Sequence, residues 1–105
     1  MKTLLHYIDG AFVAPVTDMG RFPVINPATE EQVAEIAMGS AEDANIAVAA
    51  AHRAFQEYSL TTLEERIALM EKLLEVYMRR YGEVADAITT EMGAPKDFSH
   101  NAQAE

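Results

Sequence analysis

The stretch from Thr61 to Tyr81 constrains the fold most, because its large apolar residues recur at steps of four and three. These residues are Leu63, Ile67, Met70, Leu74, Tyr77 and Tyr81. Such spacing places six apolar side chains on one stripe of an α-helix. Thr61 and Glu64 fit a capping box at the start of this helix, and Gly82 is expected to end it. A stripe of this size needs a second surface to cover it.

Residues 1–39 have the pattern of short extended segments. Aromatic and β-branched runs flank Asp9-Gly10, and this arrangement predicts a β-hairpin. Pro23 and Pro27 keep the segment between them extended, because each proline disfavours the helical conformation of the residue before it. Apolar residues then alternate from residue 32 to residue 38 and predict a third extended element, which Gly39 ends.

Residues 40–105 are predicted to be helical. Ser40 and Asp43 have the spacing of a capping arrangement, and an alanine-rich stripe follows as far as Tyr58. Small side chains allow a neighbouring backbone to approach closely, so we expect this helix to pack against the 61–81 helix as an antiparallel helical hairpin. A third helix is expected over residues 83–92, where Gly93 ends it, and a fourth helical stretch follows residue 95.

The charge and the cysteine count exclude several classes of function. The chain carries 17 acidic and 8 basic residues and a net charge of −9, which repels nucleic acid and anionic membrane surfaces. There is no cysteine, so the sequence contains neither a disulfide nor a thiolate nucleophile. The opening residues do not have the pattern of a signal peptide, and no apolar run reaches the length of a membrane span. We therefore expect a cytoplasmic location.

Familiar catalytic patterns are also missing from these residues. The five glycines, at positions 10, 20, 39, 82 and 93, are too widely spaced for a dinucleotide fingerprint or a phosphate loop. His6, His52 and His100 are too far apart in the sequence to suggest a metal site. Paired carboxylates occur at turns and helix starts, where capping and solvation explain them. We predict no catalytic and no cofactor-binding residue within the chain.

Three local patterns, taken in order, resemble the amino-terminal end of the aldehyde dehydrogenase superfamily. They are Tyr7–Val13, then Val24–Thr29 with the strand and the Ser40–Asp43 segment after it, and finally Thr90–Pro95. Each pattern is weak alone, but their conjunction and spacing extend over nearly the whole chain.

The resemblance implies a longer α/β parent enzyme that oxidises an aldehyde to a carboxylic acid, or to a thioester in some members, with NAD or NADP as cofactor. The catalytic cysteine, asparagine and glutamate of the family, and its nucleotide-binding elements, would lie beyond Glu105. Residues 1–105 would then be the amino-terminal part of the cofactor-binding domain, truncated before those elements, inactive alone and without bound cofactor. Its partners would be the remainder of the enzyme and further copies in a homo-oligomer, with no nucleic acid and no membrane.

The same resemblance implies one metal site. Some members hold a structural monovalent cation through main-chain carbonyls and an acidic side chain, which correspond here to Val24, Ile25 and Glu91. Hard oxygen ligands suit such an ion. The alternative interpretation is that Glu91 is simply solvated at a helix end.

Two hypotheses for function remain open at the level of sequence. The first is the scaffold segment of an NAD(P)-dependent aldehyde dehydrogenase just described. The second is a freestanding acidic helical protein-interaction module, whose Leu63–Tyr81 stripe receives a partner helix. The first predicts exposed apolar surface and self-association of the isolated chain, whereas the second predicts a well-behaved monomer.

Overall fold

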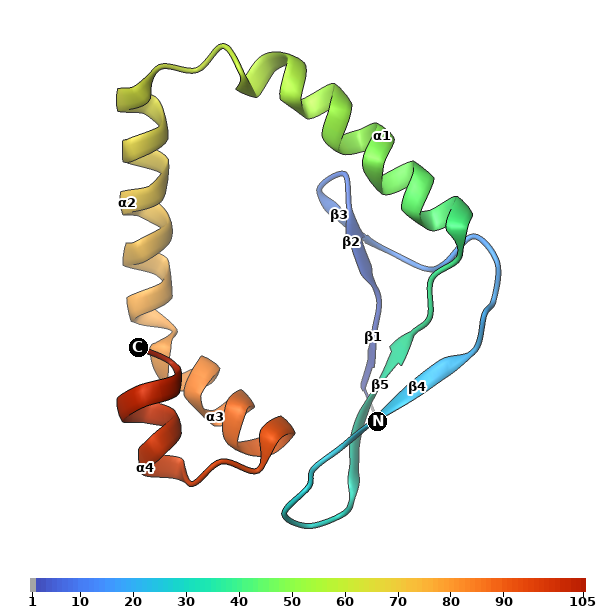
Figure 1. The fold of residues 1–105 in the computed structure, drawn as a ribbon, viewed down its shortest axis with the longest axis vertical. Helices are drawn as coiled ribbons and strands as arrows, with labels where there is room; N and C mark the ends of the chain where they lie inside the picture. The colour runs from blue at the N-terminus through green and yellow to red at the C-terminus, as the bar shows by residue number, and fades with distance from the viewer. Residues whose placement is uncertain (1) are drawn as a thin grey trace. The chain divides into compact units, whose positions relative to one another are not determined.

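A computed structural model describes residues 2–105, in which five short strands precede the helices (Figure 1). The strands are β1 (Lys2–Leu4), β2 (His6–Ile8), β3 (Ala11–Val13), β4 (Arg21–Ile25) and β5 (Gln32–Ala37). The helices are α1 (Ala41–Tyr58), α2 (Leu63–Arg79), α3 (Tyr81–Met92), the single turn α4 (Lys96–Phe98) and the π-helix η1 (Ser99–Gln103). The chain forms two compact units: residues up to 24 together with 32–60, and residues 25–31 together with 61–105.

The first unit contains a three-stranded sheet in the order β1-β5-β4. β1 pairs with β5 in parallel, with Lys2 opposite Ala34 and Leu4 opposite Ile36. A parallel pair requires a crossover connection, so strands that are neighbours in space are far apart in the sequence. The extended elements predicted before residue 39 are therefore present, and the sheet joins them in an order that local sequence patterns do not specify.

The predicted hairpin at Asp9-Gly10 is confirmed. β2 and β3 pair antiparallel, with His6 opposite Val13. Asp9 and Gly10 have φ angles of 54° and 81°, and two successive positive φ values are the signature of the tight turn that suits the twist of a hairpin. Arg53 on α1 reaches this turn and donates from Nη2 to Asp9 Oδ2 at 3.3 Å.

The predicted capping arrangement at the start of α1 is also confirmed. Asp43 accepts hydrogen bonds from Ser40 N at 2.8 Å and Ser40 Oγ at 2.9 Å, and Ser40 Oγ accepts from Asp43 N. Asp43 is only 6% exposed and accepts a further bond from Val16 N at 2.9 Å. The backbone amides of Ser40 and Val16 hold the pKa of this carboxyl below its ordinary value. Asp43 thus fixes both the helix start and the loop before β4.

The start of α2 corrects the sequence prediction by one residue. Thr62, and not Thr61, is the N-cap: its hydroxyl accepts from Glu65 N at 3.2 Å, and Glu65 Oε2 accepts from Thr62 N at 2.8 Å. Both the 61/64 and the 62/65 pairs match the capping-box pattern, so the pattern alone could not choose between them.

The end of α2 also differs from the prediction, because Gly82 does not stop the helix. The break falls at Arg80, which has φ −106° and ψ 10°, and Gly82 lies inside α3. Tyr77 and Tyr81 flank the break with their rings edge to face, 6.0 Å between centroids. Their hydroxyls donate to the backbone carbonyls of Ala104 and His100. Tertiary contacts with the last residues thus hold the bend that the sequence pattern missed.

The carboxyl-terminal segment packs on α3 and forms the small core of the second unit. Ala85 and Ser99 are fully buried and Ala104 is 3% exposed. Thr89 Oγ1 donates to Ser99 Oγ at 2.9 Å, which satisfies the buried hydroxyl. The predicted helical stretch after residue 95 is therefore present, as one α-turn followed by a π-helix.

The predicted helical hairpin stays a prediction, because α1 and α2 belong to different compact units. No helix within residues 2–105 combines the length and the apolar character that a bilayer crossing requires.

Candidate functional site

The three residues predicted to bind a cation lie at the ends of two elements. Val24 and Ile25 are the last residues of β4, and Glu91 lies in the last turn of α3. Ile25 and Glu91 belong to the second unit, whereas Val24 belongs to the first. Ile25 and Glu91 are exposed and Val24 is half-buried. Two carbonyls and a carboxylate form the all-oxygen donor set that a hard cation prefers, so the chemistry of these residues fits Na⁺ or K⁺.

The turn after Ile25 is held by its own hydrogen bonds. Asn26 Oδ1 accepts from Ala28 N at 2.9 Å, and the Asn26 carbonyl accepts from Glu30 N at 2.8 Å. Asn26 N donates to the Glu31 carbonyl at 2.9 Å, and Glu30 adopts a positive φ of 62°. Asparagine favours such a turn because its side chain imitates a backbone carbonyl. The turn is therefore a compact unit with a defined shape.

This turn lies against the end of α3. Gly93 ends the helix in the left-handed conformation, with φ 71°, and its amide donates to the Thr89 carbonyl at 3.0 Å. A Cβ atom on Gly93 would lie 2.7 Å from Pro27 Cγ. The Asn26-Pro27 and Met92-Gly93 segments, which belong to two separate sequence patterns, thus form one contact. A glycine and a proline in these patterns hinted at special backbone geometry, but nothing in the sequence paired them.

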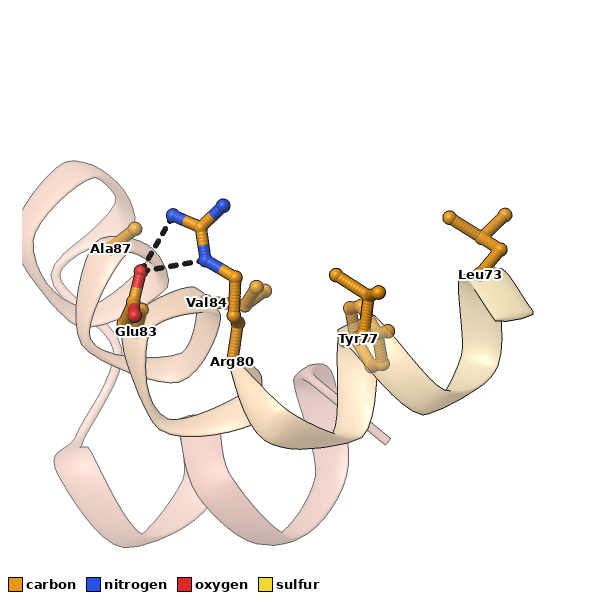
Figure 2. A pocket seen from close by; sticks show the side chains of 7 residues that line it. Leu73, Tyr77, Arg80, Glu83, Val84 and Ala87 are labelled. Carbon is orange, nitrogen blue, oxygen red and sulfur yellow. Dashed lines mark hydrogen bonds and ion pairs between the residues drawn. The ribbon is translucent and has the colours of Figure 1, made fainter. Parts of the chain in front are cut away.

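A groove follows the bend between α2 and α3 (Figure 2). Its volume is about 440 Å³, and Leu73, Tyr77 and Val84 supply apolar parts of its lining. Arg80 donates from Nε and Nη2 to Glu83 Oε2 at 3.0 Å and 2.7 Å. This bond raises the pKa of the Arg80 guanidinium, which therefore stays charged. The pair lies at the bend between α2 and α3 and joins Arg80 to the first turn of α3.

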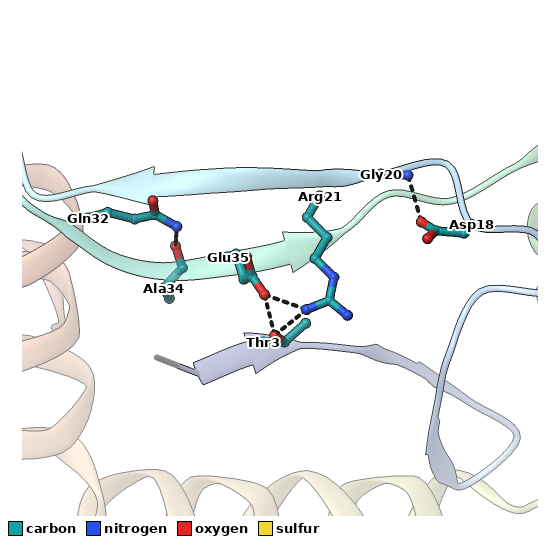
Figure 3. A network of polar contacts seen from close by, with 7 residues as sticks. All are labelled: Thr3, Asp18, Gly20, Arg21, Gln32, Ala34 and Glu35. Carbon is teal, nitrogen blue, oxygen red and sulfur yellow. Dashed lines mark hydrogen bonds and ion pairs between the residues drawn. The ribbon is translucent and has the colours of Figure 1, made fainter.

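A polar cluster spans the three-stranded sheet (Figure 3). Thr3 Oγ1 donates to Glu35 Oε1 at 2.6 Å, and Arg21 Nη1 donates to the same oxygen at 2.5 Å and to Thr3 Oγ1 at 2.9 Å. The Thr3 hydroxyl, followed by Arg21, lowers the pKa of Glu35. The carboxylate is therefore a weak base, and the cluster joins β1, β4 and β5 rather than activating a nucleophile.

The predicted apolar stripe is divided in two by the structure. Tyr77 and Tyr81 are half-buried under the carboxyl-terminal segment. The other four residues are exposed and form the surface that we call the α2 face: Leu63 (59% exposed), Ile67 (49%), Met70 (60%) and Leu74 (59%). They line a groove of about 550 Å³. No residue of α2 is buried in the structure of residues 2–105, so the surface that the sequence predicted as buried lacks its cover.

The described residues contain no cluster of side chains that could hold a transition metal. Across residues 2–105 no group of three histidine, aspartate or glutamate side chains converges as metal ligands. The sequence has no cysteine to act as a nucleophile. The described structure thus presents an exposed apolar face on α2.

Comparison with known proteins identifies the family. The sequence model described as the Aldehyde dehydrogenase family matches residues 12–104, so the chain belongs to the aldehyde dehydrogenase family. The crystal structure of an aldehyde dehydrogenase from Bartonella henselae matches with a TM-score of 0.95 and 42% identity, over 99% of this chain and 22% of that one. A mutant of aldehyde dehydrogenase C from Pseudomonas syringae, in complex with NAD⁺ and octanal, matches with a TM-score of 0.89 and 43% identity, over 93% of this chain and 20% of that one.

A curated relative gives the same result. The 3-succinoylsemialdehyde-pyridine dehydrogenase of a Pseudomonas species is 44% identical over 89 residues, which are 85% of this chain and 18% of the relative. The chain thus spans about a fifth of the length of the proteins it matches. The family resemblance and the α/β fold class are confirmed, and the freestanding interaction module has no support.

Proposed function

We propose that this chain forms the amino-terminal part of an NAD-dependent aldehyde dehydrogenase that oxidises an aldehyde to a carboxylic acid. The family match over residues 12–104 is the observation that carries the proposal. The bound NAD⁺ in the Pseudomonas syringae relative supports NAD as the cofactor. The close agreement with the Bartonella henselae structure supports the same local fold in the intact enzyme.

Within that enzyme the chain acts as scaffold. Bound NAD would supply the hydride acceptor, and the groups that attack the aldehyde would come from residues outside this chain. The chain supplies instead a sheet locked by Thr3, Arg21 and Glu35, a capped α1, and the α2 face that packs on the remainder of the protein. Packing of this kind contributes to activity only by holding other elements in place.

The test is to express the uninterrupted reading frame that contains these residues and to follow aldehyde-dependent formation of NADH. Formation of NADH and of the carboxylic acid in equal amounts is expected, with NADP as the cofactor comparison. The 105-residue chain alone serves as the control and should form no NADH. A folded full-length protein that reduces neither cofactor with any of a panel of aldehydes would refute the proposal.

We infer further that a monovalent cation binds the carbonyls of Val24 and Ile25 and the carboxylate of Glu91. The contact between Pro27 and Gly93 supports this, because it brings the segments after Ile25 and after Glu91 together. The melting temperature of the full-length protein should rise when Na⁺ or K⁺ replaces a bulky organic cation. Glu91→Gln should abolish the rise, whereas Glu71→Gln on α2 should leave it intact. An unchanged rise in Glu91→Gln would mean that Glu91 is merely solvated.

We also propose that the intact enzyme is a cytoplasmic homo-oligomer. The family membership and the absence of cysteine from these residues support this. Light scattering after size-exclusion chromatography, and fractionation of the source cells, test the two parts separately. A monomer, or recovery in the membrane fraction, would contradict the corresponding part.

A further inference from the structure

We propose that Gly93 and Pro27 form a steric clamp that fixes the Ile25–Glu31 turn against the end of α3. The contact is unusually close: a Cβ on residue 93 would meet Pro27 Cγ at 2.7 Å and Pro27 Cβ at 3.6 Å. Real Cβ atoms do not approach another carbon to 2.7 Å, so either the turn or the helix end must move when a side chain is added. Glycine at this position is therefore required twice, for its backbone angle and for its missing side chain.

Both partners of the clamp are rigid, so a displacement of Gly93 displaces the turn that contains Pro27. Proline has a fixed ring and cannot turn aside as a flexible side chain would. Its turn is held by the Asn26 bonds to Ala28 N and Glu30 N. Gly93 is anchored in turn by the hydrogen bond that its backbone N–H donates to the Thr89 carbonyl. A displacement at Gly93 must therefore shift the turn as a whole, and with it the backbone of Ile25 at its edge.

Other glycines in the chain allow the two requirements to be separated. Gly10 has a φ of 81° and nothing within 4 Å of its missing Cβ, so Gly10→Ala reports backbone strain without a clash. Gly93→Ala combines strain and clash. Gly93→Asn adds a side chain that tolerates the left-handed conformation, so it reports the clash with little strain. Pro27→Ala removes the ring carbon that a Cβ on residue 93 would meet.

Hydrogen–deuterium exchange of the full-length protein, read by amide-resolved mass spectrometry, measures the effect at each end. The reporters are the amides of Asn26 and Glu30 in the turn and of Gly93 at the helix end. Gly93→Ala and Gly93→Asn should each accelerate exchange of the turn amides by about tenfold or more, since a displaced turn loses its bonds. Gly10→Ala should accelerate exchange only at its own hairpin.

The double variants decide the matter. If the clamp exists, Gly93→Asn should accelerate exchange of the helix-end amide much less in a Pro27→Ala background than in the native one, because the clash is gone. Turn amides that exchange at the native rate in both Gly93 variants would overturn the proposal. So would an effect of Gly93→Asn that is the same with and without the Pro27 ring.

Discussion

The α2 face should cause the isolated chain to self-associate, and its strength follows from the exposed fractions of four side chains. Leu63, Ile67, Met70 and Leu74 are each about half exposed or slightly more. Full burial of such side chains is worth about 1.5–3 kcal/mol each, so their exposed halves offer about 1 kcal/mol each. A symmetric pair of faces then gains about 8 kcal/mol, of which the cost of association offsets about half when it lies at the low end of its range of about 4–15 kcal/mol. We expect a weak dimer, with a Kd of about 1 mM.

Ile67→Gln with Met70→Gln removes half of this face without changing the charge, and glutamine forms helices at least as well as the residues it replaces. The symmetric contact loses about 4 kcal/mol, close to a thousandfold in Kd, and the variant should remain monomeric. Lys72→Gln with Glu75→Gln is the matched control, because it removes an exposed ion pair of the same helix without changing the net charge. The measurement is sedimentation equilibrium over a range of protein concentrations. Added salt should strengthen association of the native chain, since each copy carries a net charge of −9.

A native chain that stays monomeric at every concentration would refute the reasoning, because the α2 face would then be covered by the chain's own residues. Association that is equally strong in the glutamine variant would show that the α2 face is not the contact surface. In that case the contact would involve another surface, such as the open edges of the β1-β5-β4 sheet.

Three further predictions concern local structure. The pKa of Asp43 is lowered on folding, so its contribution to stability is present above its unfolded pKa of about 4 and is lost as the pH falls through the lower folded value. The Val16 amide, which donates to Asp43, should therefore lose protection from hydrogen exchange in acid. Asp43→Asn should remove this acid dependence. Gly82→Ala should stabilise α3 by about 0.5–1 kcal/mol, measured by denaturant unfolding of the full-length protein, because Gly82 lies inside the helix with open space at its missing Cβ; destabilisation would mean that the backbone there is special. Thr62→Ala should lower the stability of α2 by about 1 kcal/mol, measured by circular dichroism, because it removes the capping hydroxyl. Thr62→Ser keeps that hydroxyl and should retain the stability.

Sequence patterns predicted those features whose cause is local. The hairpin at Asp9-Gly10, the cap at Ser40 and the helix end at Gly93 each depend on the backbone preferences and side-chain atoms of a few adjacent residues. The parallel pairing of β1 with β5 could not be predicted, because its cause lies in residues about 30 positions apart. The break at Arg80 belongs to the same class, since carboxyl-terminal carbonyls hold the two tyrosines beside it.

The candidate site likewise has features that the sequence indicates and features that depend on non-local contacts. The residue types at Val24, Ile25 and Glu91 were identified from resemblance to a family, and their positions at element ends are visible in the structure. The clamp that relates the two segments was not predicted, because it depends on an atom that Gly93 lacks. Missing atoms leave no sequence signal beyond the glycine itself, and glycine has several other uses.

The α2 helix shows how local and non-local causes separate within one element. Its capping box and its bend at Arg80 define where it begins and ends, and the intact Bartonella henselae relative has the same local fold. None of its residues is buried within residues 2–105, however, and most of the stability of a helix in a protein comes from packing of its amphipathic face. Local sequence therefore determines where α2 begins, whereas contacts with the carboxyl-terminal residues hold its end and its stability must come from atoms that cover the α2 face. Regular local structure with an exposed apolar face fits a scaffold segment of a larger enzyme. A freestanding module would bury that face with its own residues.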